Sequence, residues 1–162
     1  ENMLALLNAA EIVGRQPLRV VVDSRLRTPA ESKLVNLDGN VVIATAAPEQ
    51  DFKTTYNARV TQVSLPDGEG RVNLRGLLEY LGARECNDVL IEAGPELCGA
   101  FVQAGLVDKM VIYMAGKLMG STARPLLNLP LTAMSQAINL DIEDIRAVGN
   151  DWRITAIPRP QC

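Results

Sequence analysis

The residues from Ile91 to Ala100, IEAGPELCGA, have the types and spacing of an anion-binding turn. Gly94 follows an apolar run and allows the chain to turn, and Pro95 suits the first position of a helix because it has no N–H to leave unpaired. The next backbone amides would lack partners and would lie at the positive end of the helix dipole. The segment therefore predicts a phosphate-binding site, with the Glu92 carboxylate beside it.

Simpler explanations exist for each of these residues. Gly94 and Pro95 also suit a strand-to-helix turn that binds nothing, and Glu92 could be satisfied by helix amides or by a nearby arginine. Glu96 is an acid of the kind favoured in a first helical turn, so only its backbone is expected to matter for a phosphate. Cys98 is most simply a small buried group, because no histidine or CxxC partner activates it.

The absence of histidine limits the chemistry available to the 162 residues. It excludes Ser-His-Asp and Cys-His catalysis and any histidine-bound metal. The three cysteines, Cys86, Cys98 and Cys162, form no CxxC pair, which favours reduced thiols over disulfides or a structural zinc site. The chemistry must therefore use carboxylates, hydroxyls, cations or a cofactor.

Composition indicates one globular domain. Hydrophobic residues make up 48% and charged residues 22% of the chain, which is ordinary for a soluble protein. The net charge of −3 argues against a nucleic-acid surface. The apolar runs are too short to cross a bilayer, and the first residues lack the basic start of a secretory signal. We therefore expect no nucleic acid, no membrane and a cytoplasmic location.

The elements that must position the turn alternate between strand and helix, which predicts an α/β fold. Residues 18–23 form a continuous β-branched run, the pattern of a central strand buried on both faces. A leucine stripe follows Asn73, a good helix N-cap, and Gly149-Asn150 suits a hairpin turn. The pattern predicts strands at 18–23, 41–45, 58–65, 89–92, 109–115, 137–148 and 151–157, helices at 73–83 and 95–104, a long loop at 116–131, and a helix in the first sixteen residues.

Two longer segments carry a family resemblance: DSRLRTP after the first apolar run, and IEAGPELCGAFVQAGLVDKMVIYMAGKLMGSTARPLL further on. They resemble the reductase half of the bacterial riboflavin-biosynthesis deaminase–reductase, over about residues 17–157. The resemblance implies a three-layer αβα mixed sheet like that of dihydrofolate reductase, with a C-terminal antiparallel hairpin. It also implies a homodimer that uses NADPH to reduce the ribosylamino group of a phosphorylated aminouracil.

The resemblance also assigns roles to particular residues. It implies substrate binding by Glu92, and it identifies neither a catalytic residue nor a metal ligand. Cofactor binding is implied for the serine after the first strand and for the glycine-proline turn: Ser24, Gly94, Pro95, Glu96, Leu97, Cys98, Gly99 and Ala100. An ordinary turn or cap hydroxyl is the alternative for Ser24.

Some family elements have no counterpart in these residues. The family's first strand and much of its substrate pocket precede DSRLRTP, and its deaminase half, normally in the same polypeptide, carries zinc ligands that are not found here. We therefore expect residues 1–162 to form a single reductase-like domain without its first strand and substrate-binding N-terminal segment. Two alternatives remain: a non-catalytic nucleotide-binding or dimerising fragment, and a related reductase acting on another substrate.

Overall fold

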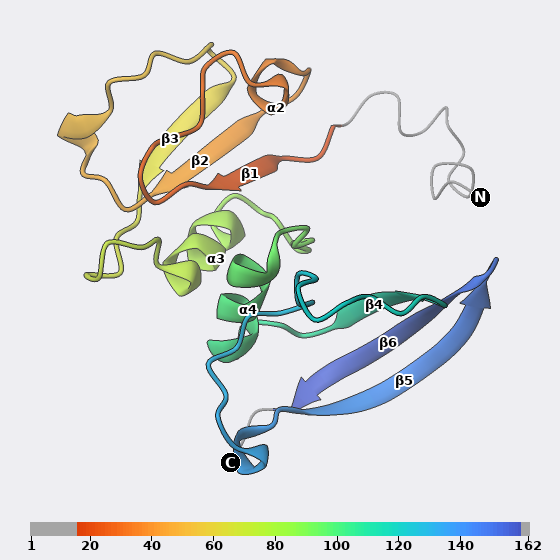
Figure 1. Ribbon diagram of the computed structural model, residues 1–162. Helices are drawn as coiled ribbons and strands as arrows, with labels where there is room; N and C mark the ends of the chain where they lie inside the picture. The colour runs from red at the N-terminus through yellow and green to blue at the C-terminus, as the bar shows by residue number, and fades with distance from the viewer. Residues whose placement is uncertain (1–15, 160–162) are drawn as a thin grey trace. The chain divides into compact units, whose positions relative to one another are not determined.

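The computed structural model describes residues 16–159, which fall into two compact units, one ending at Asn87 and the other beginning at Asp88 (Figure 1). The helix predicted for the first sixteen residues lies outside the described residues, except for Gln16, which is not helical. Among residues 16–159, no helix has the length and apolar character needed to span a membrane.

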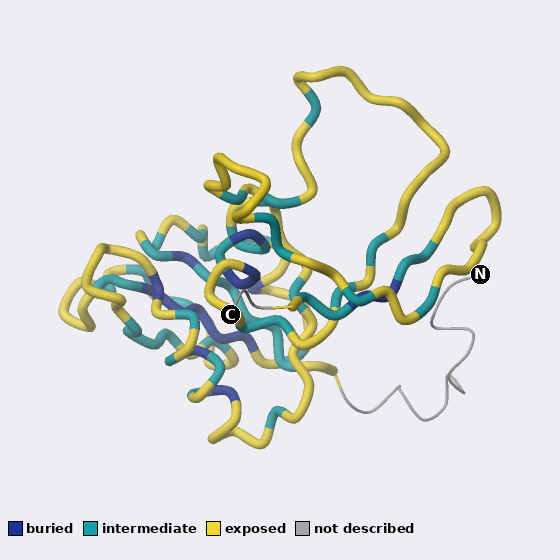
Figure 2. The backbone as a smooth tube through the Cα atoms, turned by 90° about the horizontal axis from the view of Figure 1, so that it is seen from below, coloured by how far each residue is buried: buried dark blue, intermediate teal, exposed yellow. Residues whose placement is uncertain are grey.

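The first unit is built on a parallel sheet with the order β1-β2-β3 (Figure 1). Its strands are β1 (Arg19–Val22), β2 (Val41–Thr45) and β3 (Val60–Ser64), which confirms the three predicted strands. All five residues of β2 are buried, and they belong to the dark blue segments of Figure 2. β1 was expected to be the central strand, but it is half-buried and lies at the edge of this sheet, so β2 takes the central place.

Helix α3 (Leu74–Gly82) packs on this sheet. The side chain of Asn73 accepts a hydrogen bond from the Gly76 amide at 2.9 Å, which confirms the predicted N-cap. Leu77 and Leu81 are buried in a core cluster with Ala44 and Val72. The unit also contains the short helix α2 (Lys33–Asn36) and the 3-10 turn η2 (Glu49–Asp51).

The second unit contains helix α4 (Pro95–Gln103) and an antiparallel sheet with the order β4-β6-β5 (Figure 1). Its strands are β4 (Met110–Ala115), β5 (Asn139–Val148) and β6 (Asp151–Arg159), and η3 (Met134–Gln136) is a 3-10 turn. β5 and β6 form the predicted hairpin, whose turn includes Gly149 at φ +62°. Residues 116–131 contain no helix or strand, as expected.

Helix α4 begins and ends where its sequence predicts. Pro95 occupies its first turn, and Gly105 follows its last turn at φ +63°. The Gly105 amide donates to the Val102 carbonyl at 3.1 Å, and the Leu106 amide donates to the Phe101 carbonyl at 3.0 Å. This pair of bonds is a Schellman motif, in which glycine is favoured because the left-handed conformation strains other residues.

The strand predicted at 89–92 is wrong. Residues 86–94 form neither helix nor strand, and 43% of Val89 and 76% of Leu90 are exposed. An apolar run becomes a strand only when a neighbour completes its backbone hydrogen bonds, and no strand pairs with this run among residues 16–159.

The α/β class and the antiparallel C-terminal hairpin are confirmed. The parallel strands and the antiparallel strands lie in two separate three-stranded sheets.

Candidate cofactor-binding site

The N-terminus of α4 presents unpaired backbone amides. Gly94 is the N-cap, and its carbonyl accepts the first helical bond from the Cys98 amide at 3.1 Å. Within residues 16–159, the amides of Glu96 and Leu97 have no acceptor. Two free donors at the positive end of a nine-residue helix can receive the oxygens of an anion.

Gly94 leaves this helix end open. Its backbone, at φ −72° and ψ 171°, is extended and available to any residue, so the turn does not require glycine. A Cβ atom built at Gly94 would meet nothing within 4 Å. Gly94 and Glu96 are both exposed, so the amides are accessible on the surface of this unit.

The other residues of the predicted cofactor-binding turn are less exposed than Gly94 and Glu96. Pro95, Leu97, Cys98 and Ala100 are half-buried. The Cys98 thiol donates to the Ala93 carbonyl at 3.4 Å, which supports the simple structural explanation of this cysteine.

Gly99 is buried because the backbone of Asn128 packs against it. A Cβ atom built there would lie 2.1 Å from the backbone oxygen of Asn128. Its missing side chain therefore admits a protein segment, and its place beyond the first helical turn takes it away from the free amides.

Glu92 lies in the irregular segment before the turn. It is exposed and has no hydrogen bond or ion pair with any residue between 16 and 159. The alternative explanation, that a nearby arginine or helix amides satisfy this carboxylate, is not supported by the described contacts. The carboxylate is free to accept hydrogen bonds from a bound molecule.

Ser24 lies in the other unit, two residues after the end of β1. Its hydroxyl oxygen accepts a hydrogen bond from the Val72 amide at 3.3 Å, which ties the turn to the residues before α3. The hydroxyl proton has no acceptor in the part of the chain that the structure describes. Ser24 therefore has a structural bond and can still donate to a ligand.

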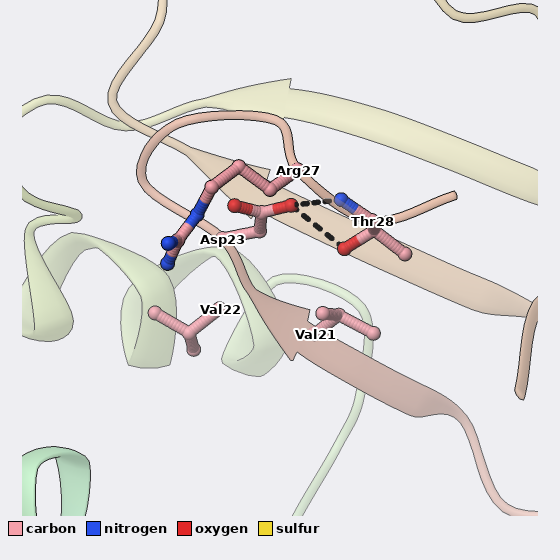
Figure 3. A pocket seen from close by; sticks show the side chains of 5 residues that line it. All are labelled: Val21, Val22, Asp23, Arg27 and Thr28. Atoms are coloured by element: carbon pink, nitrogen blue, oxygen red, sulfur yellow. Dashed lines mark hydrogen bonds between the residues drawn. The ribbon is translucent and has the colours of Figure 1, made fainter. Parts of the chain in front are cut away.

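Asp23, which was not among the predicted site residues, organises the turn that carries Ser24. It is 8% exposed, and its carboxylate accepts from the Thr28 amide at 2.6 Å and from the Thr28 hydroxyl at 2.7 Å (Figure 3). Burial acts to raise the pKa of Asp23, but the hydrogen bonds from Thr28, Arg25 and Arg27 outweigh it and hold this pKa below its ordinary value.

A pocket opens at the same turn. Figure 3 shows the Asp23 carboxylate directed at Thr28 within it, and the pocket is lined by Val21, Val22, Asp23, Arg27 and Thr28. An acid directly after a strand, with a threonine five residues further on, was the available signal for Asp23, because short acidic side chains often bond to the backbone of their own turn.

Together, the strand and helix order defines a mixed α/β domain of the dihydrofolate-reductase type. The model of the RibD C-terminal domain family matches residues 2–154, and the chain belongs to this family.

Two curated relatives illustrate the match. The riboflavin biosynthesis protein RibD of Escherichia coli K12 is 37% identical over 138 residues, which are 85% of this chain and 37% of that protein. The 5-amino-6-(5-phosphoribosylamino)uracil reductase of Buchnera aphidicola is 28% identical over 148 residues, 91% of this chain and 70% of that protein. The chain thus spans little more than a third of the RibD relative.

Among solved structures, Acinetobacter baumannii RibD superposes with a TM-score of 0.75 at 32% identity. The similarity covers 89% of this chain and 38% of that one. The predicted family and fold are therefore confirmed.

Proposed function

We propose that the protein to which this chain belongs catalyses the NADPH-dependent reduction of 5-amino-6-(5-phosphoribosylamino)uracil to its ribitylamino product. The main support for this proposal is the family match over residues 2–154. It is supported by a relative whose name states this reductase activity and which aligns with 91% of the chain.

The helix N-terminus fits the anionic part of the cofactor. We assign the Glu96 and Leu97 amides to the pyrophosphate oxygens, with Gly94 leaving room for their approach. Pro95, Cys98, Gly99 and Ala100 then act by building the helix that aims these amides. NADPH supplies the hydride for the reduction, while the protein contributes binding, orientation and electrostatics.

Two further side chains, one in each unit, are proposed to contact the ligands. The free hydroxyl proton of Ser24 suits donation to a phosphate or ribose oxygen of the cofactor. The Glu92 carboxylate, exposed and unpaired within residues 16–159, suits acceptance from uracil N–H groups or ribose hydroxyls. This assignment gives Ser24 to the cofactor and Glu92 to the substrate.

The test is NADPH consumption in the presence of the aminouracil substrate, with product identified by mass. We expect turnover in the polypeptide that joins these residues to the family's substrate-binding N-terminal segment, a substrate KM raised about tenfold or more in Glu92→Gln, and an unchanged Kd for NADPH in that variant. Glu85→Gln is the control, since Glu85 is an exposed acid outside the proposed site. A protein that binds NADPH and leaves the aminouracil unreduced would contradict the proposed activity.

We further propose what the family resemblance implies, a homodimer with a deaminase domain in the same polypeptide; this chain aligns with only 37% of the Escherichia coli RibD. β4 pairs only with β6 among residues 16–159, and Val111, Tyr113 and Met114 are 52%, 62% and 51% exposed. An apolar edge strand of this kind suits contact with a second copy. Sedimentation velocity should give twice the chain mass, and a monomer at micromolar concentration would contradict the dimer.

A further inference from the structure

Asn128 fastens the segment that follows β4 to the first turns of α4. Its backbone amide donates to the Pro95 carbonyl at 3.0 Å, and its side-chain amide donates to the Glu96 carboxylate at 2.6 Å. Its backbone carbonyl occupies the space beside Gly99 where a Cβ atom would stand. We call these three contacts the Asn128 clasp.

The side-chain bond of the clasp joins residues 32 positions apart, and Asn128 itself lies in neither a helix nor a strand. Two of its contacts use the backbone of Asn128 and so do not depend on its side chain. The third uses the side-chain amide of Asn128, which donates to a charged acceptor. This side chain can therefore be replaced while the two backbone contacts still hold the segment.

The role of the hydrogen bond between Asn128 and Glu96 follows from the position of Glu96. Its carboxylate belongs to the first turn of α4, beside the unpaired amides of Glu96 and Leu97. An acid at this position is attracted to the helix N-terminus, so a free Glu96 carboxylate would compete with an incoming phosphate and repel it. The hydrogen bond to Asn128 instead holds the carboxylate beside the segment that packs on Gly99.

Resting on the proposed function, we propose that Asn128 is a positioning residue for the cofactor: it restrains the Glu96 carboxylate so that the helix amides stay open to the NADPH phosphates. Asn128 acts through Glu96 and does not itself touch the cofactor.

If Asn128 acts through Glu96, the effect of substituting Asn128 should depend on which residue occupies position 96. Asn128→Ala keeps both backbone contacts of the clasp and releases Glu96. It should raise the Kd for NADPH about two- to fivefold, the size of one charge acting at a helix terminus. In a Glu96→Gln background the same substitution should leave the Kd unchanged, because a neutral side chain competes little for the amides.

A second variant replaces the donor by an acid. Asn128→Asp places a carboxylate that repels Glu96, so NADPH binding should be weaker than in the wild type at pH 7. The double variant Asn128→Asp with Glu96→Gln restores a donor–acceptor pair with the same net charge, and should restore wild-type affinity.

The measurement is NADPH titration by cofactor fluorescence, with melting temperatures taken on the same samples. An Asn128→Ala effect that is equal in the wild-type and Glu96→Gln backgrounds, or that is absent from both, overturns the positioning role while leaving the cofactor site in place. Failure of the wild type to bind NADPH overturns the cofactor assignment itself, and this inference with it.

Discussion

Two glycines five residues apart, Gly94 at the N-cap of α4 and Gly99 inside the helix, have different surroundings. Gly94 borders open space with an ordinary backbone conformation, whereas Gly99 is packed against the backbone of Asn128. The resemblance grouped them as cofactor-binding residues, but only Gly94 lies where a ligand can approach the free amides.

This difference gives a matched pair of predictions. Gly99→Ala should destabilise the protein by about 1–3 kcal/mol, the usual range for overpacking, because the Asn128 backbone must move. Gly94→Ala should leave the free energy of unfolding within about 0.5 kcal/mol of the wild type. Urea unfolding measures both, and equal losses would show that the contact with Asn128 is not rigid.

Asp23 gives a prediction with a defined pH dependence. Its pKa is lower in the folded protein than in the unfolded chain, where it is about 3.9. Its ionised form therefore stabilises the fold above that value, and the contribution disappears as the pH falls through the lower folded pKa.

Asp23→Asn tests this directly. The substitution should cost about 1–3 kcal/mol at pH 7, because it disturbs the acceptor for the Thr28 amide and hydroxyl. The difference from the wild type should shrink below pH 4. A difference that stays constant from pH 7 to pH 3 would exclude the carboxylate charge as its source.

Among the elements, α4 was predictable because its signals are local. Pro95 and Gly105 set its two ends through backbone constraints that operate within a few residues. The same holds for Asn73 before α3 and for the turn at Gly149.

The end of α4 can be tested by substitution. Gly105→Ala places a side chain at φ +63° and should cost about 1 kcal/mol. Gly82→Ala is the control: Gly82 ends α3 in a helical conformation with open space around it, so alanine should be neutral or stabilising. Thermal unfolding of both variants should separate them, and equal melting temperatures would contradict the strain assigned to Gly105.

The strand predicted at 89–92 shows what local signals cannot supply. Val89, Leu90 and Ile91 have the composition of a buried strand, but a strand also needs a hydrogen-bonded neighbour, which the run itself does not encode. The central position assigned to β1 failed for a related reason. Burial on both faces depends on sheet order, which is a property of the whole sheet.

At the scale of the molecule, the sequence predicted the family, the fold class and the open helix end. The contact between Gly99 and Asn128 and the hydrogen bonds of Asp23 had to come from the structure. The first joins segments 29 residues apart, and the second depends on a turn geometry in which Leu26 adopts φ +52°. Neither contact follows from the short-range repeat of a helix or a strand, which is what a sequence pattern reveals.

The assignment of the α4 amides to NADPH underlies both the proposed function and the role proposed for Asn128. The most direct measurement is a fluorescence titration of NADPH into the wild type, Gly94→Val and Gly82→Val, with folding checked by circular dichroism. We expect saturable binding by the wild type and Gly82→Val, and a Kd raised at least tenfold in folded Gly94→Val, because a branched side chain would then occupy the open space at the N-cap, next to the residues whose amides are free. Binding that is unchanged in folded Gly94→Val, or absent from the wild type at millimolar NADPH, would contradict the assignment.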